Sequence, residues 1–183
     1  MSKVFQKITI FFIIAIWIIL IIFTIFLLEF PKKYYNYVNE YASVYNLDKN
    51  LIFAVIKTES NFDEKAVSKS GAIGLMQIMP STAEFIAKKL NRENFKTDDL
   101  YSPKTNIEFG VFYLKYLLNK FDDLEALCAY NAGETVVLNW LNSEDYSLEQ
   151  NKLNKIPYKE TEWYVKKVNI SKNIYSFRLK LFI

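Results

Sequence analysis

The sequence predicts an all-α protein in which one transmembrane helix precedes a helical domain. Apolar residues recur at intervals of three and four in most segments, and no segment alternates apolar and polar residues convincingly enough to indicate a strand. Near the amino terminus an unbroken apolar run extends over positions 8–28. The periodicity indicates helices with one buried face, and the run indicates a membrane span.

The apolar run from Ile8 to Leu28 contains about 21 uncharged positions, mostly Ile, Phe and Leu, and Pro31 follows it. This length meets the roughly 20 residues that a helix needs to cross a bilayer. A cleaved signal peptide would have a shorter apolar core and small residues at its cleavage site, which the segment from Thr24 to Phe30 lacks. We therefore expect an uncleaved anchor in residues 1–33 and a second domain in residues 34–183.

The second domain is expected to be a succession of helices. Asp48 can cap one helix, Ser102 and Pro103 have the form of an N-cap with a first-turn proline, and the pattern Ser81-Thr-Ala-Glu84 predicts a capping box. The helices expected in chain order are Tyr34–Tyr45, Leu51–Ser60, Ser81–Leu90, Ser102–Phe121, Asp123–Asn131, Glu134–Leu141 and a last one that follows Pro157 and continues toward Tyr175.

Two segments lack a helical period. Residues 61–79 contain Gly71 and Gly74, two of only four glycines in the chain, and are expected to form a loop-rich wall beside Glu59. The polar residues 142–155 are expected to form a surface loop.

Glu59 is the strongest candidate for proton-transfer chemistry, because the chain contains no histidine. Helical spacing places it on the same stripe as four apolar residues, Leu51, Ile52, Val55 and Ile56. Burial and the negative end of the helix dipole both disfavour a charged carboxylate, so both raise the pKa of Glu59. A raised pKa suits a general acid. A buried glutamate with a purely structural role would show the same pattern.

Composition excludes several other functions. Lys3, Lys7, Lys32 and Lys33 belong to the anchor segment together with Glu29, so residues 34–183 carry 19 of the 23 basic and 19 of the 20 acidic side chains. This balance argues against nucleic-acid binding. Cys128 is the only cysteine, so the chain cannot form an internal disulfide, a cysteine–histidine pair or a metal site built on cysteine and histidine.

Five sequence blocks in register resemble the catalytic domain of the soluble lytic transglycosylases, a lysozyme-like family that cleaves bacterial peptidoglycan. They extend over roughly residues 38–170 and consist of Glu59-Ser60, Gly74-Leu-Met-Gln-Ile78, Asn106 with Gly110 and Tyr113-Leu114, Ala129-Tyr-Asn-Ala-Gly133, and Pro157-Tyr-Lys-Glu-Thr161 with Tyr164, Val165 and Val168. The resemblance implies that one glutamate, Glu59, acts as acid and then as base. The product would be a 1,6-anhydromuramoyl end, and no metal or organic cofactor is implied.

The resemblance also assigns roles to further residues. Ser68 would support Glu59 by a hydrogen bond, although it could equally be a turn residue. Tyr130 would support Glu59 or the substrate. The residues expected to contact the glycan are Gln77, Met76, Met79, Asn131, Glu160 and Tyr158. The two methionines could instead belong to the core, and Tyr158 and Tyr164 could serve packing alone.

The expected partners are peptidoglycan glycan strands, the membrane through Ile8 to Leu28, and a component of the cell-wall or secretion machinery. Lys3 and Lys7 precede the span and Lys32 and Lys33 follow it, so charge barely biases its orientation. A substrate outside the cytoplasmic membrane implies a single-pass protein with a cytoplasmic amino terminus and an extracytoplasmic catalytic domain. A hydrolytic muramidase of the same fold and a noncatalytic glycan-binding scaffold are the alternatives.

Overall fold

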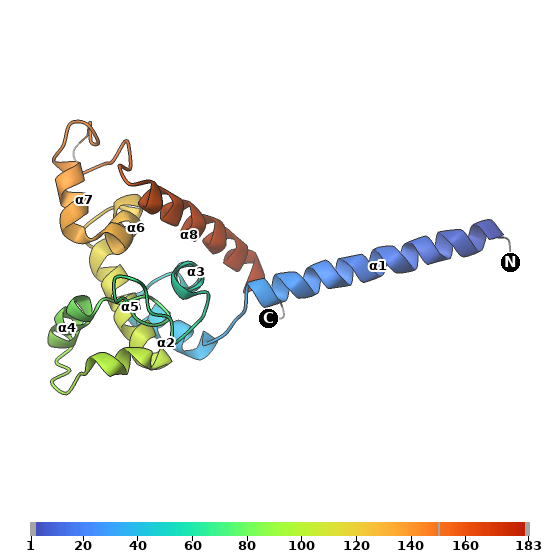
Figure 1. Cartoon of the computed structure of the whole chain (residues 1–183), viewed down its shortest axis with the longest axis horizontal. Coiled ribbons are helices and arrows are strands. Elements are labelled where there is room, and N and C mark those ends of the chain that lie inside the picture. Colours follow the sequence, from blue (N-terminus) through green and yellow to red (C-terminus); the bar gives the residue numbers. More distant parts are fainter. Residues whose placement is uncertain (1–2, 150, 182–183) are drawn as a thin grey trace. The chain divides into compact units, whose positions relative to one another are not determined.

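The computed structural model describes residues 3–149 and 151–181, and within these residues it is helical with no named strand (Figure 1). This confirms the all-α prediction. The chain divides into two compact units, of which the first ends at Lys33 and the second begins at Tyr34. The elements in order are α1 Lys3–Glu29, α2 Tyr35–Tyr45, α3 Lys49–Ser60, α4 Pro80–Lys89, the 3₁₀ helix η1 Thr97–Tyr101, α5 Pro103–Leu118, α6 Asp123–Ala132, α7 Glu134–Leu141 and α8 Lys159–Arg178.

The first unit consists mainly of α1. Its segment Phe5–Glu29 is long and apolar enough to cross a membrane. At a rise of about 1.5 Å per residue this helix exceeds the hydrocarbon thickness of roughly 30 Å. Its large apolar side chains are exposed along most of its length, as expected for a helix whose partner is lipid.

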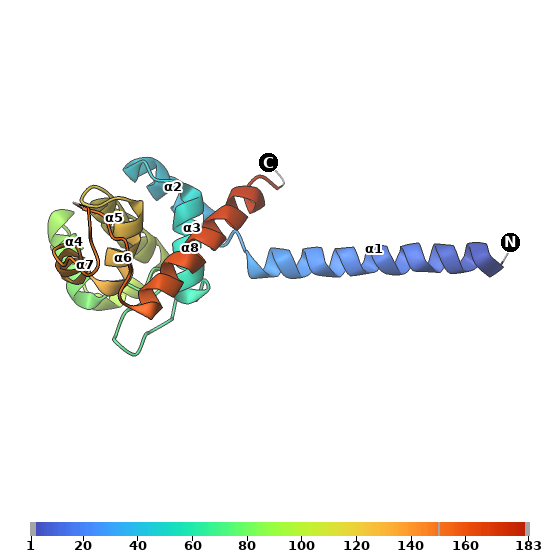
Figure 2. The same ribbon diagram turned by 90° about the horizontal axis from the view of Figure 1, so that it is seen from above.

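The core of the second unit is built around α3. All six residues at positions 51–56 are buried, so this helix is surrounded on every side and does not present a single apolar stripe. Helix α8 packs along it (Figure 2), and the rings of Phe53 and Tyr175 stack with centroids 5.1 Å apart. The buried part of α3 ends at Ile56, and the last turn of the helix, which carries Glu59, is partly exposed at the edge of this core.

The wall predicted for residues 61–79 contains no helix and is held by single β-bridges, Val67 with Ile73 and Ile73 with Ile78. Hydrogen bonds run in both directions between the backbone of Ile73 and Ile78, at 3.0 Å each. Several backbone positions in this segment are left-handed, including Phe62 and Gln77. The segment is thus a compact folded loop, and we call it the loop wall.

One predicted helix start and one predicted cap need correction. Helix α4 begins at Pro80, with Met79 in extended conformation as its N-cap, so Ser81 lies within the first turn and forms no capping box. The physical reason is that proline lacks an N–H and is already set to a helical φ, which suits the first helical position. Helix α5 begins at Pro103 after Ser102 as predicted, but the Ser102 hydroxyl makes no capping hydrogen bond, and the 3₁₀ helix before it was not predicted.

Candidate active site

Glu59 is the next-to-last residue of α3 and is partly buried. Burial raises its pKa from 4.5 to about 7, and the nearby Tyr164 hydroxyl opposes this rise. Among the described residues no charged group contributes to this rise of the Glu59 pKa. The site therefore contains one carboxyl that is about half protonated near neutral pH, without a second carboxylate close enough to affect its charge.

Tyr164 comes from the first half of α8 and faces the Glu59 carboxyl. It is 6% exposed, and burial together with the charge of Glu59 raises the pKa of its hydroxyl well above the usual value. Within the described part of the chain its hydroxyl has no partner at strict hydrogen-bond distance and angle, while its hydrogen-bonding contact with Glu59 lowers the pKa of that carboxyl. Sequence reasoning left Tyr164 between packing and function, because helical spacing alone does not show which residue it faces.

Ser60 ties the end of α3 to the loop wall. Its hydroxyl donates to the Leu75 carbonyl at 2.8 Å and contacts the Ile56 carbonyl at 3.2 Å. A serine hydroxyl has one proton, so the shorter contact to Leu75 is the stronger hydrogen bond. Ser60, which follows Glu59 in the sequence, therefore attaches the loop wall to the end of α3.

Asn106 of α5 anchors the loop wall from the other side. It is fully buried, accepts a hydrogen bond from the Met76 amide at 2.8 Å, and donates to the carbonyls of Ile73 at 2.9 Å and Leu100 at 2.8 Å. One amide side chain thereby satisfies three buried backbone groups. Sequence reasoning placed Asn106 in a motif but gave it no role.

Two glycines make room for this arrangement. Gly74 has a φ of +80°, and a Cβ there would overlap the Asn106 amide and lie 2.7 Å from the Leu100 carbonyl oxygen. A Cβ on Gly110 would overlap the Met76 sulfur. Both glycines therefore allow the loop wall to pack closely on α5.

Met76 requires a correction. Its side chain is fully buried against Gly110, so it belongs to the core and is not an adaptable contact for a glycan. Its backbone still matters to the site, because the Tyr130 hydroxyl donates to the Met76 carbonyl at 2.9 Å. The hydroxyl proton of Tyr130 is therefore used in a hydrogen bond to the loop wall. Burial and then the charge of Glu59 raise the pKa of Tyr130 well above its usual value, so it stays a neutral neighbour of the acid.

Asn131 and Gln77 are also held in place by the protein. The Thr161 hydroxyl of α8 donates to Asn131 Oδ1 at 2.8 Å. The Gln77 amide donates to the carbonyls of Ala66 at 3.1 Å and Gly74 at 2.9 Å. Both amide protons of Gln77 are thus used within the loop wall, which leaves its oxygen as the group with capacity to accept from a ligand.

A pocket of about 200 Å³ collects four of the predicted residues, Gln77, Met79, Tyr130 and Asn131. Its other lining residues are Ile78, Thr82, Tyr113, Ala132 and Gly133. We call this hollow the Gln77 pocket. Met79 is 37% exposed, so its side chain is available to a ligand. The loop wall, α4, α5 and the end of α6 each contribute a side to this pocket.

Like Glu59 and Met76, three further predicted residues do not line the Gln77 pocket. The Ser68 hydroxyl accepts from the Ala72 amide at 3.0 Å and so stabilises a turn in the loop wall. Tyr158 is 54% exposed and packs edge-on against Trp140 at 5.0 Å. Glu160 is exposed in the first turn of α8. Contacts of these three with Glu59 or with a glycan stay predictions.

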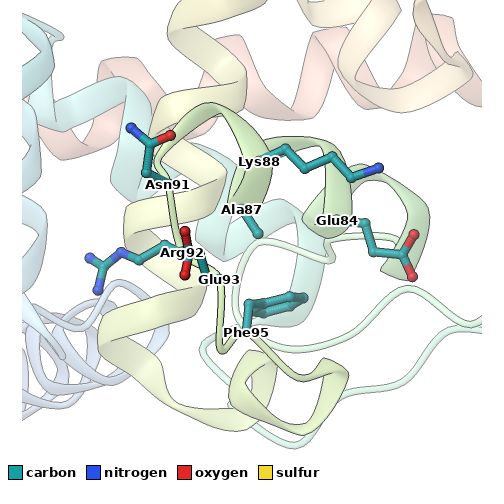
Figure 3. A pocket seen from close by; sticks show the side chains of 7 residues that line it. All are labelled: Glu84, Ala87, Lys88, Asn91, Arg92, Glu93 and Phe95. Atoms are coloured by element: carbon teal, nitrogen blue, oxygen red, sulfur yellow. The ribbon is translucent and has the colours of Figure 1, made fainter.

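A larger hollow of about 410 Å³ lies at the end of α4 and the segment after it (Figure 3). It is lined by Glu84, Ala87, Lys88, Asn91, Arg92, Glu93 and Phe95, and Arg92 pairs with Glu108 at 2.7 Å nearby. It shares no lining residue with the Gln77 pocket. We place the candidate active site at Glu59, whose charge raises the pKa of Tyr130 in the lining of the Gln77 pocket, although Glu59 itself does not line that pocket. Within the described residues no cluster of three or more His, Cys, Asp or Glu is arranged to hold a metal ion.

Comparisons with known proteins show the family of the chain. A profile of the transglycosylase SLT domain matches residues 36–163. The chain is 34% identical over 144 residues to the soluble lytic murein transglycosylase of Salmonella typhimurium, covering 76% of this chain and 22% of that protein. It is 34% identical over 137 residues to the membrane-bound lytic murein transglycosylase C of Histophilus somni, covering 68% and 37%.

Solved structures show the same likeness. An inactive mutant of the lytic transglycosylase Slt from Pseudomonas aeruginosa superposes with a TM-score of 0.73 at 32% identity, covering 82% of this chain and 25% of that one. The 70 kDa soluble lytic transglycosylase in complex with bulgecin A superposes with a TM-score of 0.73 at 31% identity. The chain thus spans about a quarter of these enzymes. Because the family profile extends over more than half of the sequence and the helical architecture agrees, the chain belongs to the transglycosylase SLT domain family.

Proposed function

We propose that this protein is a membrane-anchored lytic murein transglycosylase in which Glu59 is the catalytic acid and base. The observation that carries the proposal is a single partly buried carboxyl with a pKa of about 7 at the edge of the core, without a second carboxylate contributing to its charge state. Glycosidases that use water ordinarily need two carboxyl groups on either side of the bond. A single acid suits a reaction in which the nucleophile belongs to the substrate.

The reaction can be written with Glu59 as the only protein group that exchanges a proton. Neutral Glu59 donates its proton to the oxygen between N-acetylmuramic acid and N-acetylglucosamine as the bond to muramoyl C1 breaks. The C6 hydroxyl of the same muramoyl residue then bonds to C1, and the Glu59 carboxylate removes the hydroxyl proton. The products are a 1,6-anhydromuramoyl end and a free hydroxyl on the departing sugar. Glu59 ends protonated as it began, and water is not consumed.

The surroundings of Glu59 suit both the protonated and the deprotonated form of its carboxyl group. Its pKa of about 7 makes the neutral and the charged form nearly equal in free energy near neutral pH, as an acid that later acts as a base requires. The Tyr164 hydroxyl favours the carboxylate, and Tyr130 lies close enough to be affected by its charge. We assign both tyrosines to positioning, and the Gln77 pocket to the sugars beside the bond that breaks. Stabilisation of the charge at C1 is assigned to the acetamido group of the substrate.

We further propose that residues 1–33 anchor the enzyme and that residues 34–183 form the catalytic domain on the outer side of the cytoplasmic membrane. The support is the apolar helix α1 and the similarity to a relative named as membrane-bound. Attachment of a membrane-impermeant thiol reagent to a single cysteine placed at Ser2 or at Lys33, in a Cys128→Ser background, tests the topology. We expect labelling of intact spheroplasts at position 33 alone, and labelling at position 2 alone would reverse the orientation.

Product analysis of purified peptidoglycan tests the chemistry. Mass spectrometry should find anhydromuramoyl ends, whereas a hydrolytic muramidase of the same fold would leave reducing ends. Glu59→Gln should lower the rate by at least about a hundredfold while the exposed control Glu93→Gln changes it little. Full activity of Glu59→Gln would remove Glu59 from the mechanism. Binding of glycan by the wild-type chain without any cleavage would favour the noncatalytic scaffold.

A further inference from the structure

Helix α8 has a second apolar face that does not contribute to the core. The helix lies at the outside of the second unit (Figure 1), and its inner face packs on α3 and α6. On the outer face Trp163 is 61% exposed, and Ile170, two turns later, is 60% exposed. Phe177 continues this line after a further seven residues and is also exposed. A spacing of seven places side chains on one side of a helix, and we call this line of side chains the α8 stripe.

Lysine side chains flank the α8 stripe. Lys166 and Lys167 are exposed and lie between Trp163 and Ile170, and Lys166 Nζ is 5.3 Å from the Trp163 ring centroid. Helix α8 carries five basic and two acidic residues. One of the acidic residues, Glu162, pairs with Lys166 at 2.6 Å, and no acidic residue follows it in the helix. Because residues 34–183 carry equal numbers of basic and acidic side chains, this positive excess is local to α8.

This combination is typical of a helix that lies in the interface of a bilayer. Tryptophan is enriched at the boundary between headgroups and acyl chains, because its ring is apolar and its N–H is polar. Lysines beside an apolar line can lay their stems on apolar surface and place their ammonium groups among anionic headgroups. Single exposed apolar side chains are ordinary on a protein surface, whereas an aligned set with basic flanks indicates a binding face.

The anchor keeps a bilayer within reach of this face. Helix α1 ends at Glu29 and α2 begins at Tyr35, so residues 30–34 connect the two helices. Fully extended, these residues span at most about 18 Å. A tether of this length gives the second unit a high effective concentration at the membrane, so a contact too weak to hold an untethered protein is occupied in the anchored one. The covalent link therefore favours the bilayer over a separate protein as the occupant of the α8 stripe.

We propose that the outer face of α8 docks on an anionic bilayer surface, with Trp163 and Ile170 inserted between the headgroups and Lys166 and Lys167 facing the lipid phosphates. This contact goes beyond the proposed function, because it makes α8 a second membrane attachment in addition to α1 and requires no catalysis. No residue of α8 lines the Gln77 pocket, so docking leaves that pocket open to a ligand.

Quenching of Trp163 fluorescence by brominated lipid tests the inference in the full chain. The chain has three tryptophans, so Trp17→Phe removes the one in α1, and the emission of buried Trp140 is measured in Trp17→Phe/Trp163→Phe and subtracted. The chain is reconstituted into vesicles of phosphatidylcholine alone or mixed with phosphatidylglycerol, each with and without bromine on the acyl chains. Both leaflets have the same composition, so the orientation of the inserted chain does not affect the result.

Two variants alter the outer face of α8, and a third is the matched control. Ile170→Ser removes apolar surface and Lys167→Gln removes a charge, both at exposed positions. Leu148→Ser makes the same apolar-to-polar change at an exposed side chain outside α8.

In vesicles with phosphatidylglycerol we expect bromine to lower the Trp163 emission by about twofold, because the apolar face of an interfacial helix reaches the acyl boundary. Quenching should weaken in phosphatidylcholine alone, and also in about 1 M salt, which screens charges beyond roughly 3 Å. Ile170→Ser and Lys167→Gln should each weaken the quenching, and Leu148→Ser should leave it unchanged.

Equal Trp163 emission in brominated and ordinary vesicles would overturn this inference. Protection of Trp163 from acrylamide, a water-soluble quencher, without quenching by bromine would overturn it in favour of a protein partner. Failure of the full chain to float with vesicles would contradict the α1 anchor as well. None of these measurements depends on peptidoglycan cleavage, so failure of the catalytic proposal is distinguished from failure of this one.

Discussion

At the scale of single residues, Glu59 combines two environments. Its position at the end of α3 exposes it to the negative end of the helix dipole, and the surrounding core withdraws it from water. Burial is the largest cause of the raised Glu59 pKa. The stability of the domain and the activity of the site therefore both depend on protonation of the Glu59 carboxyl.

The stability of the protein should therefore depend on Glu59 in a defined pH window. The native state holds the proton up to about pH 7 while an unfolded chain releases it near 4.5, so the native form binds more protons between these values. The free energy of unfolding then falls as pH rises through this window, by at most about 3 kcal/mol. Glu59→Gln should be more stable than wild type at about pH 8 and similar to it at about pH 4 in urea denaturation. Equal stability at both values would show that the carboxyl is not withdrawn from water.

The hydroxyl of Thr161 is a second residue whose effect can be isolated. It is buried and donates to Asn131 Oδ1, so it orients a side chain of the Gln77 pocket from α8. Thr161→Val removes the donor at nearly constant shape and should cost about 1–2 kcal/mol of stability and raise the KM for peptidoglycan. Thr161→Ser keeps the hydroxyl and should restore most of the KM. A KM unchanged in Thr161→Val would mean that Asn131 needs no such support.

At the scale of elements, the loop wall depends on α5. Asn106 provides its hydrogen bonds and Gly110 provides its space, and the two lie about one helical turn apart on the same face of α5. The sequence identifies the loop by its lack of period and by its glycines, but it does not show which helix supports the loop. That information requires contacts between residues about 30 positions apart.

Gly110→Ala tests this packing directly. The added methyl would overlap the Met76 side chain, so we expect a loss of about 1–3 kcal/mol of stability and lower activity, because Met76 carries the carbonyl that holds Tyr130. Met76→Ala in the same chain relieves the overlap. Denaturation of the single and double variants should show that their effects are not additive. Additive effects would mean that the two residues do not meet in solution.

At the scale of the whole molecule, residues 34–183 contain a complete core of their own. Deletion of residues 1–33 should therefore leave a folded domain whose thermal unfolding midpoint stays within about 4 °C of that of the full chain. The deleted form should cleave soluble glycan strands and no longer sediment with membranes. Circular dichroism and fractionation measure the two outcomes, and loss of cooperative unfolding would show that the anchor contributes to the core.

Several features follow from the sequence alone, because they depend on neighbours along the chain. The apolar length of α1, the helical periods and the start of α5 at Pro103 all arise from local spacing. The family resemblance also selects Gln77, Tyr130 and Asn131, which line one pocket, and their contact with a glycan stays a prediction. What the tertiary structure decided depends on distant segments meeting. It placed Tyr164 beside Glu59, the Met76 side chain in the core and Gln77 in one pocket with Tyr130, because the packing of α3, α5, α6 and α8 determines which faces are covered and which remain open to a ligand.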